Sequence, residues 1–567
     1  MRLKSITIKN YNQFKDFKLD FTNNNNDYDN LYKKLIDLCI IVGENGVGKS
    51  IFLEILEDVL NTNFKPRDYP KAEIIIDIEF DPNELKDVIF TKYDMVDIED
   101  IEDIEDMEDM EDNLLNKFKQ LRIKIYNKDV YYLLINNGEI KIKDFLTQIS
   151  NEFIDIKKYG RILEYNEIRE NFKEILKRFT VFKSVSIKKQ IKTNESINND
   201  DNKYLKKQEP LKYITSILGD KINVRSVVFK EFEQITDKKL DFHIDNNNNV
   251  NIYIYNEYEN ELHNLSDGEI QLLFLLVFIL DKSEKMPLVI DEPMAICSYN
   301  RIRYLLELIP KTDKQVILTT HRTECITPKT IKNLILFKKY GNSTKPIILN
   351  NALKEVCDDE INVSNLHDCI YHCPNLLFEK YMVFVEGKTD LKFYDALCQN
   401  IPDVNLSVFQ MGGGNMRFPE ICHALKSNAK FIYDGDKKKE ISTKYGRNNP
   451  SVYYLSNNIN GMNGFGEVES LINLIFKGQN IKNTKINYEL ENKKEYDTYR
   501  KHKKNRKIKN LLNVFNIRDM IKKYISDNNL NDNNDNNDNN DNNQCEIFKL
   551  MEFLRSKFQT YELKKQK

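Results

Sequence analysis

Residues 43–50 read Gly-Glu-Asn-Gly-Val-Gly-Lys-Ser, which matches the phosphate-loop pattern G-x-x-x-x-G-K-S. The apolar run Leu38–Val42 precedes the loop and suits a buried strand, and the pattern of Ile51–Leu60 predicts an amphipathic helix. A strand, a glycine-rich loop and a helix in this order surround phosphates with backbone N–H groups at the positive end of the helix. The segment therefore predicts an α/β fold with a parallel sheet, because a chance Gly/Lys turn rarely matches this pattern in this context.

The loop residues carry separate expected roles. Lys49 is predicted to reach the β- and γ-phosphates of ATP, and the Ser50 hydroxyl is predicted to ligate Mg²⁺. The residues expected to bind the nucleotide here are Gly43, Glu44, Asn45, Gly46, Val47, Gly48, Lys49 and Ser50.

Two further apolar runs end in polar residues suited to ATP hydrolysis. Leu288–Ile290 is followed by Asp291 and Glu292, the arrangement of a Walker B strand. Asp291 is expected to hold Mg²⁺ through water, and Glu292 to polarise the attacking water. The strand predicted over Val316–Thr319 is followed by His321.

The segment Leu265–Gln271 resembles the ABC ATPase signature, in the version found in SMC/RecF-like and OLD-like heads. Ser266 and Glu269 form a capping box that starts a helix running to Leu280. An ordinary capped core helix is the alternative interpretation. The resemblance implies that Ser266 and Gly268 contact ATP bound by a second head, and therefore a homodimer or higher oligomer.

The same resemblance implies that His321 is a switch residue contacting the γ-phosphate. Two family features are not recognisable in this sequence. Residues 294–300 show no D-loop, and no glutamine can be assigned to a Q-loop.

A second set of acidic residues follows later in the chain. An apolar strand is expected to end at Glu386, and a helix to begin near Asp390; a later strand is expected to end in Asp434-Gly435-Asp436. Side chains at i and i+2 of a strand share a face, so Asp434 and Asp436 are expected to converge on one cation. Surface carboxylates that simply close ordinary α/β strands are the alternative.

Strands ending in Glu and in Asp-x-Asp resemble TOPRIM domains. The resemblance implies a metal-dependent nuclease site with Mg²⁺, or alternatively Mn²⁺, held by Glu386, Asp434 and Asp436. Glu386 is a ligand or a general acid/base in this scheme. Glu469, in a later Glu-Val-Glu motif, is expected to complete the metal site, with Asp390 and Glu467 as further candidates.

An ABC-type head followed by a TOPRIM-like domain is the arrangement of OLD-family nucleases. The string 385–394 and the motif 467–470 resemble the nuclease half of the anti-phage system called PARIS. This resemblance implies an ATP-controlled nuclease that acts on DNA or RNA in defence against foreign elements. The alternative is an SMC/RecF-like DNA-binding ATPase or scaffold that does not cut; primase- or topoisomerase-like chemistry is less favoured, because no partner domain is recognisable.

The expected fold class is α/β, with a P-loop head, a smaller parallel-sheet domain and a helical C-terminus. The expected domains are an ATPase domain over 1–350 with an acidic low-complexity insert at 97–112, a connecting helix over 351–375, a TOPRIM-like domain over 376–475, and a basic and helical region over 476–567 with an Asn/Asp run at 527–543.

Composition limits the partners and the compartment. A net charge of −3 excludes a global attraction to nucleic acid, so binding must come from local basic stretches such as 499–507. The apolar run Ile270–Leu280 is too short to span a bilayer, and no secretory signal is recognisable, so we expect a cytoplasmic protein without a membrane partner. The 9 cysteines are expected to be reduced, and the Cys/His group over 357–373 is expected to pack structurally, not to bind zinc.

Overall fold

The fold is taken from a computed structural model of the 567-residue chain. It describes residues 2–21, 37–60, 71–79, 120–126, 129–135, 139–141, 180–183, 214, 218–219, 221–244, 250–255, 259–261, 265–281, 287–292, 298–312, 314–357, 359–401, 405–412, 417–445, 449–455, 458–459, 462–463, 471, 475, 517–527, 545–558 and 560–561.

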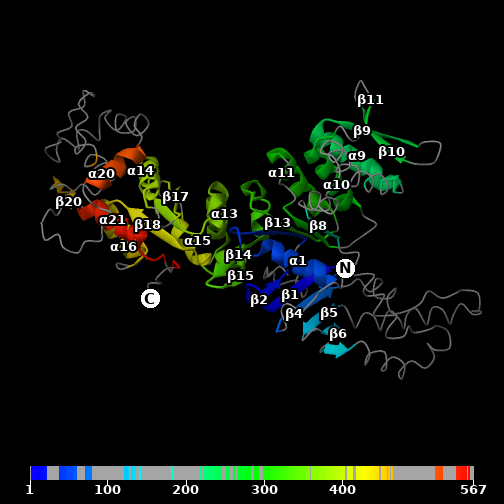
Figure 1. Ribbon diagram of the computed structural model, residues 1–567, viewed down its shortest axis with the longest axis horizontal. Coiled ribbons are helices and arrows are strands. Elements are labelled where there is room, and N and C mark those ends of the chain that lie inside the picture. The colour runs from blue at the N-terminus through cyan, green and yellow to red at the C-terminus, as the bar shows by residue number, and fades with distance from the viewer. Residues whose placement is uncertain are drawn as a thin grey trace, which may run out of the picture. The chain divides into compact units, whose positions relative to one another are not determined.

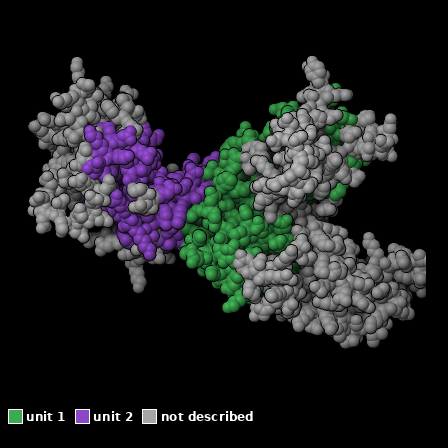
Figure 2. All heavy atoms as spheres, in the orientation of Figure 1, with its two compact units in different colours: residues 1–351 green, residues 352–567 purple. Residues whose placement is uncertain are grey.

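The described chain divides into two compact units, Met1–Asn351 and Ala352–Lys567 (Figure 2). The acidic insert at 97–112, the basic run at 499–507 and nearly all of the Asn/Asp run lie outside the described residues.

The first unit is built around a six-stranded sheet with the order β15-β14-β3-β13-β12-β8 (Figure 1). All of its strand pairs are parallel except β14 with β15. Every residue of β3 is buried, as its uninterrupted apolar sequence predicts for a central strand. The strands are β3 (Leu38–Val42), β8 (Thr180–Lys183), β12 (Leu288–Asp291), β13 (Val316–Thr319), β14 (Leu334–Tyr340) and β15 (Ser343–Ile348).

An antiparallel sheet with the order β2-β1-β4-β5-β6-β7 accompanies it. Isoleucines at alternate positions of β1 and β4 are buried, so each strand presents one face to the core. Its strands are β1 (Arg2–Tyr11), β2 (Phe14–Asp20), β4 (Glu73–Glu79), β5 (Gln120–Tyr126), β6 (Asp129–Ile135) and β7 (Glu139–Lys141). Strands β1 and β2 pair antiparallel and form an N-terminal hairpin.

An aromatic cluster joins this hairpin to the helix that follows the phosphate loop. The Phe17 ring lies 4.9 Å from Phe14, 5.6 Å from Phe52 and 5.1 Å from Phe337, measured between centroids. All four side chains are buried. The hairpin, helix α1 (Lys49–Leu60) and strand β14 therefore share one core beside the loop.

In the sequence, the remaining helices of the first unit alternate with strands of its sheets. A three-stranded antiparallel sheet, β11-β10-β9, is preceded in sequence by helix α9. These elements are α9 (Ile222–Thr236), β9 (Lys239–Ile244), β10 (Val250–Tyr255), β11 (Glu259–Glu261), α10 (Asp267–Leu280), α11 (Tyr299–Leu308) and the 3-10 turns η4 (Ile309–Lys311), η5 (Thr323–Cys325) and η6 (Ile331–Asn333). Helix α12 (Leu349–Lys354) crosses the border between the units.

The second unit has a four-stranded parallel sheet with the order β17-β16-β18-β19. The ring of Phe384 on β16 stacks on Phe409, Phe418 and Phe431 at the centre of this unit. Its elements are α13 (Glu360–His372), η7 (Pro374–Leu377), β16 (Met382–Val385), α14 (Lys388–Cys398), β17 (Ser407–Gln410), α15 (Phe418–Ala424), β18 (Ala429–Tyr433), η8 (Gly435–Lys437), α16 (Lys438–Tyr445), β19 (Val452–Tyr454), the hairpin β20 (Asn458–Ile459) and β21 (Met462–Asn463), α20 (Ile517–Asp527) and α21 (Cys545–Arg555).

Two expectations differ from this structure. The single helix expected over 351–375 is two helices, α12 and α13, followed by a 3-10 turn. Helix α14 begins at Lys388, slightly before the expected start near Asp390, because Gly387 is its N-cap and Asp390 lies within its first turn.

Helix α10 has the C-terminal end and the N-terminal capping box that the sequence predicts. The helix begins directly after Ser266 and runs to Leu280, and its capping box is present. No helix among the described residues combines the length and the apolar character needed to cross a bilayer. Every cysteine for which the structure describes a side chain is free.

Candidate functional site

The phosphate loop connects the C-terminal end of β3 to the first turn of α1. Gly43 adopts φ +144°, and a Cβ atom there would lie 2.4 Å from the carbonyl oxygen of Phe337 on β14. Only glycine accommodates both the backbone angle and this approach. Val47, Gly48 and Lys49 are buried, Glu44 is half-buried, and the exposed loop residues are Asn45, Gly46 and Ser50.

The Lys49 side chain lies inside this loop. Its ammonium group donates hydrogen bonds to the carbonyl oxygens of Gly43 at 2.7 Å and Glu44 at 3.1 Å. Burial lowers the pKa of Lys49, while the charges of Glu292 and Asp291 oppose that shift. The carboxylates of Asp291, at the end of β12, and of Glu292 are therefore close enough to Lys49 for their charges to act on its ammonium group.

Asp291 ends β12 and is positioned by the neighbouring strand. Its Oδ1 accepts a hydrogen bond of 2.5 Å from the hydroxyl of Thr319, which lies opposite it in the parallel β12–β13 register. Both side chains are buried. The hydroxyl leaves further lone pairs of the carboxylate available, which is the donor chemistry that Mg²⁺ and its water ligands prefer.

Glu292 and His321 meet just beyond the ends of these two strands. The Glu292 Oε1 lies 2.9 Å from the His321 Nδ1, and Glu292 has a positive φ of 48°. The backbone N–H of Glu292 donates to the carbonyl oxygen of Thr319 at 3.1 Å, which holds this strained residue in place. The two residues assigned to catalysis in the first unit are thus neighbours, although their sequence positions differ by 29.

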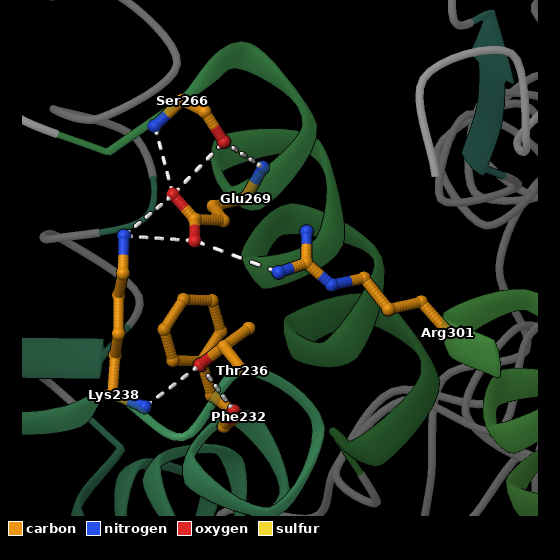
Figure 3. Close-up of polar contacts among 6 residues, drawn as sticks. All are labelled: Phe232, Thr236, Lys238, Ser266, Glu269 and Arg301. Carbon is orange, nitrogen blue, oxygen red and sulfur yellow. Dashed lines mark hydrogen bonds and ion pairs between the residues drawn. The ribbon is translucent and has the colours of Figure 1, made fainter. Parts of the chain in front are cut away.

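The N-terminus of α10 carries a buried carboxylate with several donors (Figure 3). The Glu269 Oε2 accepts hydrogen bonds of 2.9 Å from both the backbone N–H and the hydroxyl of Ser266. Lys238, in the turn between α9 and β9, places its ammonium 2.8 Å from Oε1, and Arg301 on α11 lies 3.6 Å from the same atom. The signature segment is therefore tied to two cationic side chains from other elements. Gly268 is buried in the first turn of α10, and Ser266 is exposed.

We expect the substitution Glu269→Gln to destabilise the first unit by about 1–3 kcal/mol, because it leaves Lys238 and Arg301 without their counter-charge. Burial raises the pKa of Glu269, but the hydrogen bonds from Lys238 and Ser266 outweigh it and hold the pKa below the ordinary value of 4.5. A lowered folded-state pKa contributes stability above the unfolded pKa, so the wild type should lose this contribution as the pH falls below about 4.5.

Urea denaturation of the full chain at neutral and acidic pH measures both effects. The substitution Glu233→Gln, at an exposed position of α9, is the matched control. Equal stability of the Glu269→Gln and control variants at neutral pH would contradict this role for Glu269.

In the second unit, Glu386 and Asp434 follow adjacent parallel strands, β16 and β18. The Glu386 Oε1 accepts a 2.8 Å hydrogen bond from the backbone N–H of Asp434. Asp390 accepts a 2.8 Å hydrogen bond from the backbone N–H of Gly387 and so caps α14. The Glu386 carboxylate therefore reaches the backbone of Asp434, whereas the Asp390 carboxylate caps the start of a helix.

The expected alternation of Asp434 and Asp436 along a strand is wrong. Strand β18 ends at Tyr433, Asp434 is the extended residue that follows, and Asp436 lies in the 3-10 turn η8. Because the chain leaves the extended conformation at Gly435, positions i and i+2 do not share a strand face. The side chain of Asp436 and the whole of Glu467 and Glu469 lie outside the described residues.

The described residues contain no group of three or more His, Cys, Asp or Glu side chains that could hold a metal ion. Within the Cys/His group over 357–373, the side chains of Cys357, His367 and Cys369 are buried, and that of Cys373 is partly buried. In the predicted acidic metal site of the second unit, the described side chains of Glu386 and Asp434 are two candidate ligands, fewer than the three predicted.

Sequence reasoning missed three polar residues around the nucleotide loop and the signature segment. Thr319, the last residue of β13, holds Asp291, whereas Lys238 and Arg301 hold Glu269. The position of Thr319 opposite Asp291 follows from the strand order, which no local pattern reveals. Lys238 and Arg301 carry no motif that could have identified them.

Comparison with known proteins gives one family match. The sequence model of the AAA ATPase domain matches residues 1–326, which is more than half of the chain. No curated protein matches the sequence.

Among solved structures, the chain is similar to an SMC head bound to the C-winged helix domain of ScpA, with a TM-score of 0.36 and 14% identity over 61% of this chain and 98% of that chain. It is similar to the SMC head domain from Thermotoga maritima, with a TM-score of 0.33 and 13% identity over 61% of this chain and 98% of that chain.

Proposed function

The chain belongs to the AAA ATPase domain family, and from this premise we propose that its first unit uses ATP to control a metal-dependent, TOPRIM-like nuclease in its second unit. The observation that carries the nuclease half is the meeting of Glu386 and Asp434 at the ends of adjacent parallel strands. The carboxyl ends of parallel strands are a common place for ligands in open α/β sheets.

The residues around the phosphate loop support the ATPase mechanism. Backbone N–H groups of the loop and the Lys49 ammonium bind the phosphates of ATP, and Ser50 and Asp291 hold Mg²⁺. Mg²⁺ held by these residues would neutralise charge on the phosphates. Glu292 accepts a proton from the attacking water, and His321 orients the Glu292 carboxylate and contacts the γ-phosphate.

The capped helix α10 supports an ABC-type arrangement in which two heads enclose ATP. Ser266 and Gly268 of one copy contact the γ-phosphate bound by the other, at the positive end of the helix. ATP binding therefore joins two copies, and hydrolysis separates them.

The second unit supplies the proposed cutting site. Glu386 and Asp434 hold Mg²⁺ or Mn²⁺ together with Asp436 or Glu469, since the two described carboxylates are too few by themselves. A cation held there would stabilise the charge that develops on the phosphate during cleavage of DNA or RNA. The resemblance to OLD-family and PARIS nucleases makes defence against phage or other foreign elements the proposed role.

A cleavage assay on DNA, total RNA and tRNA tests this function. With Mg²⁺ or Mn²⁺ and ATP, we expect Asp434→Asn to lower cleavage by at least about 10²-fold, because it removes a proposed ligand of the cation that stabilises the reacting charge. Asp395→Asn, at an exposed position of α14, is the control and should cleave normally. Lys49→Ala should abolish the dependence on ATP.

Absence of any Asp434-dependent cleavage on all these substrates would reject the nuclease half. The second candidate function is then an SMC/RecF-like DNA-binding ATPase or scaffold that does not cut. The AAA ATPase domain match supports this alternative as well, because it covers residues 1–326 and so concerns the first unit alone. ATP hydrolysis stimulated by DNA, with no cleavage, would support it.

A further inference from the structure

The turn between β1 and β2 lies against the phosphate loop. Gly48 has φ +94°, and a Cβ atom built on it would lie 1.8 Å from the Nε2 of Gln13 and 3.0 Å from the ring of Phe14. The end of the Gln13 side chain therefore rests on the backbone of Gly48, directly before Lys49.

The backbone of this turn is held in place by strand β15. Thr344, which is fully buried, donates its backbone N–H to the carbonyl oxygen of Gln13 at 2.9 Å. Its hydroxyl donates to the carbonyl oxygen of Val47, also at 2.9 Å. One residue thus bridges the turn and the phosphate loop, so the Gln13 side chain is presented to the loop from a fixed position.

The Gln13 amide nitrogen is buried, and no hydrogen-bond acceptor is within reach among the described residues. A primary amide carries two N–H donors, and a buried donor without an acceptor is unfavourable. This donor lies beside the phosphate loop, and phosphate groups carry several oxygens that can accept a hydrogen bond.

We propose that the Gln13 side-chain amide is part of the nucleotide-binding site and donates a hydrogen bond to an oxygen of the phosphate chain. Gln13 then acts as a binding residue contributed by the N-terminal hairpin, outside the loop itself. The amide has room beside the Phe14 ring because Gly48 has no side chain.

Three variants distinguish binding from packing. Gln13→Met keeps the length of the side chain and removes the donors, and Gln13→Glu places a negative charge against the phosphates. Lys15→Met, at an exposed position of β2, is the control. The measurements are the affinities of the full chain for ATPγS and ADP with Mg²⁺, and the thermal midpoint without nucleotide.

We expect affinity to fall in the order wild type, Gln13→Met, Gln13→Glu. The loss for Gln13→Met should be about tenfold or more, as for a hydrogen bond to a charged group. The thermal midpoint of Gln13→Met without nucleotide should equal or exceed that of the wild type, because an unsatisfied donor is removed. Affinity of Gln13→Met equal to wild type would overturn the proposal, and so would equal losses for both variants together with lowered thermal midpoints.

Discussion

Replacing Glu292 by glutamine is expected to lower the rate of ATP hydrolysis by about 10²–10⁴-fold and to leave ATP binding nearly unchanged. The carboxylate is the proposed acceptor of the proton from the attacking water, and an amide of the same shape cannot accept it. Phosphate binding depends on Lys49 and the loop backbone, which the substitution does not alter.

The geometry around Glu292 makes this substitution conservative. Glutamine can keep the backbone hydrogen bond to Thr319 and an oxygen facing His321, so the positive φ at this position remains supported. Phosphate release and ATP affinity, measured on the same preparation, separate loss of chemistry from loss of binding.

Glu307→Gln is a suitable control, since Glu307 is a partly exposed carboxylate on α11 that pairs with Lys329. Hydrolysis by Glu292→Gln within threefold of the control would rule out Glu292 as the general base.

The second large effect is expected at Lys430, a buried residue of β18 with 2% of its surface exposed. Its ammonium donates to the carbonyl oxygens of Phe553, Leu554 and Ser556 at the end of α21, the last at 2.7 Å. The same group lies 4.8 Å from the centre of the Phe553 ring and 4.1 Å from that of Phe558. A cation thus satisfies the carbonyls that the end of a helix leaves without partners.

We expect Lys430→Met to destabilise the second unit by about 2–4 kcal/mol, because these carbonyl oxygens remain buried without a donor. Urea denaturation and hydrogen exchange of residues 545–561 measure the effect on the unit and on the helix. Lys557→Met, at an exposed position just after α21, is the control and should change stability little.

The effect should depend on pH. Burial lowers the pKa of Lys430 to about 8, below the ordinary value of 10.5. Between these values the unfolded chain binds more protons, so this group adds stability as the pH rises. The difference between the wild type and Lys430→Met should therefore grow by about 1–2 kcal/mol from pH 7.5 to 9.5. A difference that does not change, or that shrinks, would contradict the assignment.

Local sequence was sufficient for the elements that carry motifs. The strand over Leu38–Val42, the helix after the phosphate loop and the capped helix after Ser266 all depend on residues within four positions of one another. Such short-range patterns can be recognised in the sequence without knowledge of the fold. The prediction that Asp434 and Asp436 lie in one strand was wrong. The chain turns at Gly435, so successive side chains no longer alternate between two faces of the sheet.

Contacts between segments that are distant in the sequence could not be predicted from local patterns. Lys430 and α21 are separated by more than a hundred residues, and nothing in the sequence near Lys430 indicates a helix end. The contact between Gln13 and Gly48 likewise depends on how the N-terminal hairpin packs on the aromatic core beside α1.

The sequence by itself determined which residue types stand at the ends of β3, β12, β16 and β18, because the loop, the acidic residues and the helix cap are short-range patterns. Only the tertiary structure decided which of them meet. Parallel strand order brings Thr319 to Asp291, His321 to Glu292 and the Asp434 backbone to Glu386. The physical reason is that strand order is set by burial of whole sheet faces, a property of the complete core that no short segment contains.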